Sequence, residues 1–124
     1  MIETWLRGYL KAWGSDDSQD IAALFTQDAR YFTEPYAEPW VGHEEIVREW
    51  AARSDCGEEW SFEHEVMAED GDVAVVRGVT RYGPKQQPEP APERPGATYH
   101  NIWLIRFAPD GRAREFTEWW MEEK

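Results

Sequence analysis

The second half of the chain restricts the fold most, because it contains four long stretches in which apolar and polar residues alternate. Alternation with a period of two is typical of strands that bury one face. Asp70-Gly71-Asp72 and Pro109-Asp110-Gly111 separate the first pair and the last pair with residues that favour tight turns. We therefore predict antiparallel strands, joined in succession, at residues 60–68, 73–82, 98–107 and 112–121.

The first half of the chain shows helical rather than alternating spacing. Apolar residues recur every three or four positions in residues 2–13, which predicts an amphipathic helix. A short helix is expected over residues 19–25, with Phe25 on its inner face, and a third helix after Gly42. Residues 31–33 are expected to form a short strand before the third helix, because aromatic and β-branched side chains favour strands. The order helix, short helix, strand, helix and then four strands in hairpin succession indicates an α+β fold, in which a cone-shaped, curved antiparallel sheet wraps around the three N-terminal helices. The open end of such a cone is the expected pocket.

The length of 124 residues fits one domain, residues 1–124, with a single core. Residues 54–58 read as a turn. Residues 84–96 contain five prolines and no large apolar side chain, so they are expected to form an extended loop between two strands.

Composition excludes several classes of function. The net charge of −12 argues against a nucleic-acid surface, and no apolar run approaches the roughly 20 residues of a membrane span. The first residues do not resemble a secretory signal, so a soluble, cytoplasmic protein is the default expectation. Cys56 is the only cysteine, and no spacing of histidines and carboxylates suggests a metal site. We expect neither a metal nor another cofactor.

The segment from Asp28 to Gly42 combines aromatic side chains with glutamates and two prolines. Prolines stiffen a loop, and a stiff loop can hold large rings in place at little entropic cost. Tyr31, Tyr36 and Trp40 therefore suit the rim of a small-molecule pocket. The alternative is a loop whose aromatic side chains pin it to the core.

Two side chains are candidates for proton transfer. His64 is the only polar group on the face formed by Trp60, Phe62, Val66 and Ala68, where it is either a general acid or base or a hydrogen-bonded core histidine. Glu118 alternates in phase with Phe116 and Trp120. Among aromatic side chains its carboxyl would be desolvated and its pKa raised, unless it pairs with an arginine.

Four motifs resemble one known family across essentially the whole chain. They are W-x-x-x-Y-x-x-A-W from Trp5, D-x-x-x-I-A-A-L-F-x-x-D-A from Asp17, E-P-x-x-E-P-W-x-G from Glu34 and A-E-D-G-D-V-A-V-V-R from Ala68. Together they resemble the SnoaL-like branch of the nuclear transport factor 2 superfamily. This resemblance implies the cone fold, but not one activity, because the superfamily contains isomerases, cyclases, dehydratases and non-catalytic binding proteins.

The resemblance also suggests site residues. Similarity to ketosteroid isomerases places an oxyanion-binding tyrosine at Tyr9, a base at Thr33 or Glu34, and the third site residue at Trp103. An indole N–H donates a hydrogen bond but cannot transfer a proton, which argues against steroid isomerisation. The same register points the face of Glu118 into the cone.

We therefore expect a small, mostly apolar or aromatic ligand between the helices and the sheet. Any chemistry would be cofactor-independent acid/base work such as isomerisation, cyclisation or dehydration, and the alternative is a non-catalytic ligand-binding or protein-interaction module. The candidate catalytic residues are Glu118, His64, Tyr9 and Glu34. The candidate ligand-binding residues are Tyr31, Tyr36, Trp40, Trp50, Asn101, Trp103, Phe116 and Trp120.

The opposite face of the sheet is also expected to be apolar, with Val73, Val75, Ile102 and Leu104 on it. A single-layer sheet with apolar side chains on both faces needs a second cover. Homodimerisation through the sheet would supply that cover, and the family resemblance points the same way.

Overall fold

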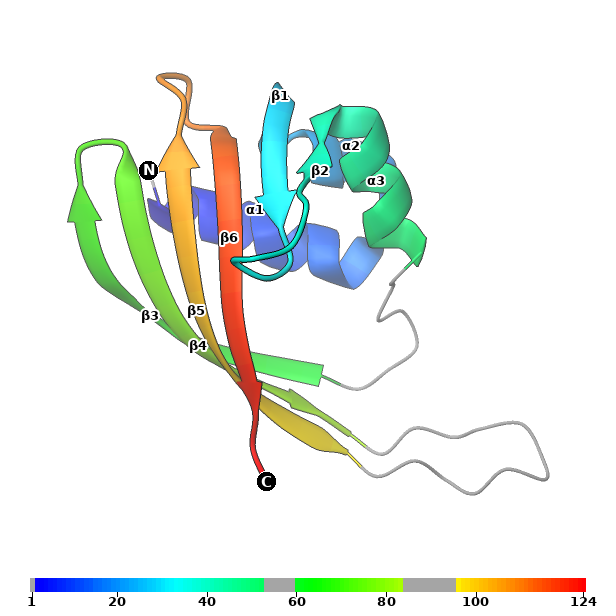
Figure 1. The fold of residues 1–124 in the computed structure, drawn as a ribbon, viewed down its shortest axis with the longest axis vertical. Coiled ribbons are helices and arrows are strands. Elements are labelled where there is room, and N and C mark those ends of the chain that lie inside the picture. Colours follow the sequence, from blue (N-terminus) through cyan, green and yellow to red (C-terminus); the bar gives the residue numbers. More distant parts are fainter. Residues whose placement is uncertain (1, 53–59, 84–95) are drawn as a thin grey trace.

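The computed structural model describes residues 2–52, 60–83 and 96–124, and in these ranges the chain forms three helices and one six-stranded sheet (Figure 1). The helices are α1 (Ile2–Ser15), α2 (Ser18–Ala22) and α3 (Gly42–Ala52). The strands are β1 (Phe25–Phe32), β2 (Trp40–Val41), β3 (Trp60–Asp70), β4 (Val73–Tyr82), β5 (Ala97–Phe107) and β6 (Ala113–Glu122). The predicted α+β class is confirmed. The predicted turn at 54–58, and residues 84–95 of the predicted proline-rich loop, lie outside the described residues.

The strand order in the sheet is β2-β1-β6-β5-β4-β3. β3, β4, β5 and β6 are antiparallel neighbours in succession, as the alternating pattern predicts. Gly71 and Gly111 in the two turns have φ angles of 60° and 91°, a conformation that glycine adopts without steric cost. The long strands curve together, and α1 lies across one face of the sheet (Figure 1).

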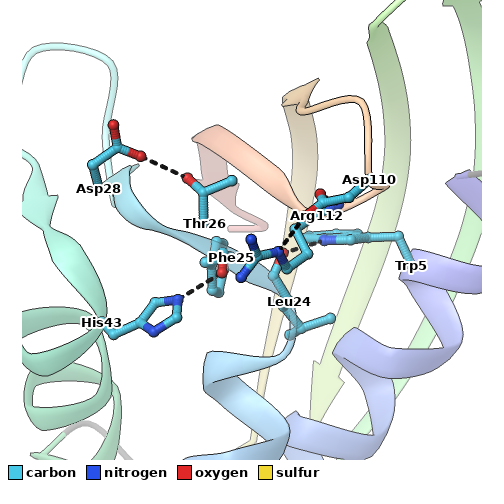
Figure 2. Close-up of polar contacts among 8 residues, drawn as sticks. All are labelled: Trp5, Leu24, Phe25, Thr26, Asp28, His43, Asp110 and Arg112. Carbon is cyan, nitrogen blue, oxygen red and sulfur yellow. Dashed lines mark hydrogen bonds and ion pairs between the residues drawn. The ribbon is translucent and has the colours of Figure 1, made fainter.

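The chain between α2 and β1 differs from the sequence-based prediction. The short helix ends at Ala22, and Phe25 begins β1 instead of extending the helix. The carbonyl of Leu24 accepts hydrogen bonds from the Trp5 indole at 2.9 Å and from the backbone N–H of Ala113 at 2.8 Å. Figure 2 shows this junction, where the His43 ring also contacts the carbonyl of Phe25, at 2.6 Å. These long-range hydrogen bonds draw the backbone into the sheet.

β1 also has two partners that the sequence pattern did not predict. It runs parallel to β6, with Tyr31 opposite Phe116, and antiparallel to the short strand β2, with Tyr31 opposite Trp40. Tyr31 therefore lies between the strand that carries Phe116 and the strand that carries Trp40. The register aligns the aromatic segment with the inner face of the sheet.

The core lies between α1 and the inner face of the sheet. The predicted apolar stripe of α1 is buried at Ile2, Trp5, Leu6, Tyr9 and Ala12. The Trp5 ring packs against those of Phe107 and Phe116, with centroids 6.1 and 6.0 Å apart. Burial of each large apolar side chain stabilises the fold by roughly 1.5–3 kcal/mol. These contacts fix the position of α1 over β5 and β6.

The predicted alternation of β5 is confirmed, because its inner face is buried at Asn101, Trp103, Ile105 and Phe107. On β3, the Phe62 ring stacks on Trp103 at 4.8 Å. Gly78 of β4 makes this contact possible. A Cβ atom at position 78 would lie 2.4 Å from the Phe62 ring.

The helices in the described ranges are too short or too polar to cross a membrane.

Candidate functional site

A cavity of about 750 Å³ opens between the helices and the inner face of the sheet. Its wall is built from α1, the end of β1 and the loop after it, β2, α3, and the strands β4, β5 and β6. Most of the predicted site residues line it. These are Tyr9, Tyr31, Glu34, Trp40, Trp50, Asn101, Trp103, Glu118 and Trp120.

Tyr36, Phe116 and His64 are placed elsewhere, which corrects the expected positions of these three side chains. Tyr36 is 84% exposed, because the chain turns between Glu34 and Ala37 and points the ring outward, next to the Glu34 carboxyl. Phe116 is fully buried beneath the rings of Tyr9 and Tyr31. It supports the cavity wall without lining it.

His64 lies on the predicted face of β3, but it is exposed and is not part of the cavity wall. β3 is an edge strand of the sheet, so only one flank of the strand is covered. The His64 ring stacks beside Phe62 with centroids 5.4 Å apart. It does not reach the group of cavity side chains around Glu118.

Several cavity residues were not assigned to the site from the sequence. They include Trp13, Asp16, Thr80, Tyr82 and Glu122. Thr80 alternates in phase with the buried Val76, so its inward direction follows from the strand pattern. Asp16, in contrast, is a turn residue with a φ of 52°, and its carboxyl accepts a hydrogen bond from the Trp50 indole at 3.3 Å. No local sequence pattern indicates that contact.

Glu118 is the central polar group of the cavity. Its Oε2 accepts hydrogen bonds from the Trp103 indole Nε1 at 2.7 Å and from the Asn101 Nδ2 at 3.0 Å. Trp103 and Glu118 are direct partners across the β5–β6 ladder, which explains why their side chains meet. Within the described residues, Oε1 has no hydrogen-bond partner.

The orientation of Asn101 is fixed by Thr80. The Thr80 hydroxyl donates to Asn101 Oδ1 at 2.9 Å, which leaves the Asn101 amide N–H₂ to donate to Glu118. Both side chains are almost fully buried. A buried amide with both ends satisfied resists rotation, so Thr80 determines which end of Asn101 faces the carboxyl.

Burial raises the pKa of Glu118, while the hydrogen bonds from Trp103 and Asn101 oppose the shift. The arginine partner considered as an alternative is not present among the described residues. Arg77 and Arg81 instead pair with Glu65 and Glu63 on the outer face, at 3.3 and 3.1 Å. Glu118 is therefore a carboxyl held by neutral donors, and burial favours its protonated form more than water would.

A second polar feature is the pair of Tyr9 and Tyr31, whose hydroxyl oxygens lie 3.0 Å apart. Burial raises the pKa of Tyr9 well above its ordinary value, and the nearby Tyr31 and Glu118 act in the same direction. Tyr9 therefore stays protonated. A neutral phenol can donate a hydrogen bond to a ligand oxygen on which negative charge develops.

The aromatic side chains of the segment from Asp28 to Gly42 fit both interpretations of that segment, as the rim of a pocket and as a loop pinned to the core. Trp40 and Tyr31 stack nearly parallel, with centroids 4.8 Å apart, and both line the cavity. Tyr31 also packs on the buried Phe116, with centroids 4.5 Å apart. The segment is thus anchored to the core by the same rings that form one side of the cavity.

In the described part of the chain, no group of three or more histidine, cysteine or acidic side chains is arranged to hold a metal ion.

Solved structures with the same architecture are numerous. A putative SnoaL-like polyketide cyclase from Shewanella denitrificans is 20% identical with a TM-score of 0.74, over 96% of this chain and 89% of that one. A ketosteroid isomerase-like protein from Erwinia carotovora atroseptica is 22% identical with a TM-score of 0.66, over 94% and 91% of the two chains. An NTF2-like protein of unknown function from Burkholderia pseudomallei is 20% identical with a TM-score of 0.70, over 96% and 89%.

A comparison with curated proteins gives no match. The sequence profile of the SnoaL-like domain, however, matches residues 6–116, which include all six strands in whole or in part. The neighbours in structure share the nuclear transport factor 2-like cone. The chain therefore belongs to the SnoaL-like family and has the nuclear transport factor 2-like fold.

Proposed function

We propose that this protein binds a small organic molecule in the cone cavity and carries out cofactor-independent acid/base chemistry on it, with Glu118 as the proton-transfer group. One observation carries the proposal: a carboxyl of raised pKa lines the cavity, is fixed at one oxygen by two neutral donors, and has no described partner at the other. Raised carboxyl pKa values of this kind suit proton transfer near neutral pH.

The arrangement supports a simple sequence of proton movements. Ionised Glu118 accepts a proton from a C–H or O–H group of the ligand at Oε1, while Trp103 and Asn101 hold Oε2. The Tyr9–Tyr31 pair stabilises charge on a ligand oxygen by hydrogen bonding. Protonated Glu118 then returns the proton to another atom of the ligand, which gives isomerisation, or to a departing hydroxyl, which gives dehydration.

Glu34 is a second carboxyl on the cavity wall and lies where the resemblance to ketosteroid isomerases places a base. Its hydrogen bond with the exposed Tyr36 places it at the rim of the cavity. In this proposal Glu34 contacts the ligand, and Glu118 transfers the proton.

Deuterium uptake in D₂O tests the chemistry with a panel of compounds in place of a single substrate. Small aromatic and polyketide-like ketones are incubated with the protein, and NMR follows exchange of the protons next to the carbonyl. Exchange should be catalysed by the wild type, lost in Glu118→Gln and retained in Glu63→Gln, which changes a carboxyl on the outer face. Equal exchange in wild type and Glu118→Gln would exclude Glu118 as the base.

The second candidate is a non-catalytic ligand-binding module, which one observation favours. The polar groups of the cavity largely satisfy one another, through Thr80, Asn101, Glu118 and Trp103 on one side and the tyrosine pair on the other. Binding of panel ketones, seen as a shift of the Trp103 indole N–H resonance, without any deuterium exchange would support this candidate.

We further propose that two copies pair through the outer face of the sheet. Large apolar side chains are exposed there: Met67 at 50%, Ile102 at 37%, Trp119 at 41% and Met121 at 72%. Ile102 and Trp119 are direct partners in the β5–β6 ladder, so they form a continuous apolar strip. A strip of this kind on one sheet face fits a symmetric interface.

A further inference from the structure

The charge of the cavity wall is entirely of one sign among the described residues. Of the residues that the structure describes, four with carboxyl groups line it, and no lysine, arginine or histidine does. The acidic residues are Asp16, Glu34, Glu118 and Glu122. They come from the turn after α1, the loop after β1, and two positions on β6, so the fold gathers them from three separate parts of the sequence.

Most lysines and arginines of the described residues form ion pairs with carboxyl groups that are not part of the cavity wall. Arg30 and Arg106 pair with Glu115, Arg77 with Glu65, and Arg81 with Glu63. The remaining described ion pairs join Lys11 to Asp20, His100 to Glu123, Arg112 to Asp110 and Arg114 to Asp72. None of these described pairs includes Glu34, Glu118 or Glu122.

The rest of the wall is rich in aromatic rings. Trp13, Trp40, Trp50, Trp103 and Trp120 contribute to it, together with tyrosines from α1, β1, β4 and β5. Trp120 is 48% exposed, and Tyr99 contacts it edge-to-face, with centroids 5.8 Å apart and an interplanar angle of 73°. Tyr99 in turn makes an edge-to-face contact with Tyr82 at 5.9 Å. An edge-to-face contact covers only one face of one ring of the pair, and indole and phenol faces attract cations.

These observations distinguish between ligand classes. A neutral ligand that filled the cavity would strip water from Glu34 and Glu122 without supplying a compensating charge, which is costly. A cation would compensate that charge, and its alkyl groups would pack on the rings. The formal net charge of −12 adds a long-range field that attracts cations to the cleft.

We propose that the ligand of this cavity is an organic cation of the ammonium class, with its charged nitrogen between the carboxyl groups and aromatic faces and its apolar body against the remaining rings. The assignment rests on the proposed function in one respect, because it names the class of ligand for the same cavity. It does not require that Glu118 be catalytic.

A pair of probes of equal shape tests the charge directly. Choline and 3,3-dimethyl-1-butanol differ by the exchange of a positively charged nitrogen for a carbon. Each is titrated at constant ionic strength while NMR records the indole N–H of Trp103, which reports on the cavity through its hydrogen bond to Glu118. Choline should bind at least about ten-fold more tightly, which corresponds to a 1.4 kcal/mol preference.

Matched variants locate the source of that preference. Glu122→Gln removes one carboxylate from the cavity wall, and Glu123→Gln removes one from the neighbouring exposed position that pairs with His100. Glu122→Gln should weaken choline binding about three-fold or more and leave binding of the alcohol unchanged, because only the charged ligand gains from the carboxylate. Glu123→Gln should leave both affinities unchanged.

Two other outcomes of these titrations would contradict the proposal that the ligand is an organic cation. If the alcohol binds as tightly as choline, the cavity binds small molecules but does not select cations, and the proposed function stands without this ligand class. If neither probe shifts the Trp103 indole, the cation assignment is wrong. Loss of deuterium exchange in Glu118→Gln tests the chemistry separately, because it is measured with neutral ketones.

Discussion

Ionisation of Glu118 opposes folding, because burial raises the pKa of its carboxyl in the folded protein. The folded state then binds more protons than the unfolded state between the two pKa values, so the free energy of unfolding falls as pH rises through the folded-state pKa. Glu118→Gln keeps the oxygen that accepts from Trp103 and Asn101 and removes the charge. We expect this variant to be more stable than wild type near neutral pH.

The stabilisation should disappear in acid, where Glu118 is protonated in both states and the variant has no charge left to remove. Urea unfolding at a series of pH values measures the effect, and Glu63→Gln on the outer face serves as the control. A stability difference that is independent of pH would show that packing, not charge, separates wild type from Glu118→Gln.

Thr80 is expected to act as a positioning residue for Glu118. Thr80→Val removes the hydroxyl that donates to Asn101 Oδ1 and leaves that buried oxygen without its partner. We expect a loss of about 1–2 kcal/mol in the free energy of unfolding and a shift of the Trp103 indole resonance, because Asn101 is no longer held toward Glu118. Thr98→Val, on the same sheet but outside the cavity wall, is the control. A Trp103 resonance unchanged from wild type would show that Asn101 keeps its orientation without Thr80.

Single residues were predictable where strand alternation decides their direction. The period of two predicts which residues of a strand share a face, and the family resemblance predicted that the face of Glu118 points inward; the structure places Asn101, Trp103 and Glu118 on the cavity wall. Alternation does not report how far a helix extends over the sheet, so it could not show that His64 would be exposed on an edge strand. Alternation also did not distinguish Phe116, which is fully buried, from the residues of the same face that line the cavity.

At the scale of elements, the packing of Phe62 of β3 against β4 requires a glycine, which has no side chain, at position 78. Gly78 lies under Phe62, and a methyl group there would overlap the ring. Gly78→Ala should force Phe62 off Trp103 and cost roughly 1–3 kcal/mol in the free energy of unfolding. Thermal unfolding measures the change.

Gly14→Ala provides the opposite result as a control. Gly14 lies in α1 with no atom within 4 Å of the added methyl group, and alanine is a better helix former. It should stabilise the protein by about 0.5–1 kcal/mol. A stable Gly78→Ala would indicate that the Phe62 ring can shift without loss of packing.

Most elements could be predicted because their own residues encode them. β4 has the predicted boundaries, and β5 and β6 begin and end within one residue of them. The end of β1 was predicted, at residues 31–33, but its start at Phe25 and the end of α2 were not. The residues from Ala23 to Phe25 have helical spacing, but their backbone is held by Trp5 and Ala113. β2 is only two residues long and exists through its pairing with β1.

At the scale of the whole molecule, the proposed dimer makes a concentration-dependent prediction. Trp119→Glu places a charge in the middle of the outer apolar strip and should dissociate the dimer, because burial of an unpaired carboxylate is costly. Analytical ultracentrifugation over a range of concentrations measures the association. Tyr36→Glu changes an even more exposed aromatic residue away from the sheet and should leave the association unchanged. A wild-type protein that stays monomeric at all concentrations would refute the proposed interface.

The position of β6 inside the sheet has a consequence for the order in which the molecule is assembled. β6 joins β1 on one side to β5 on the other, although it is the last of the described strands to be synthesised. β1 therefore leaves the ribosome long before its parallel partner exists, and the loop between them must close late at an entropic cost. Because Glu118 lies on that same strand, the cavity wall is completed by the step that unites the two halves of the sheet.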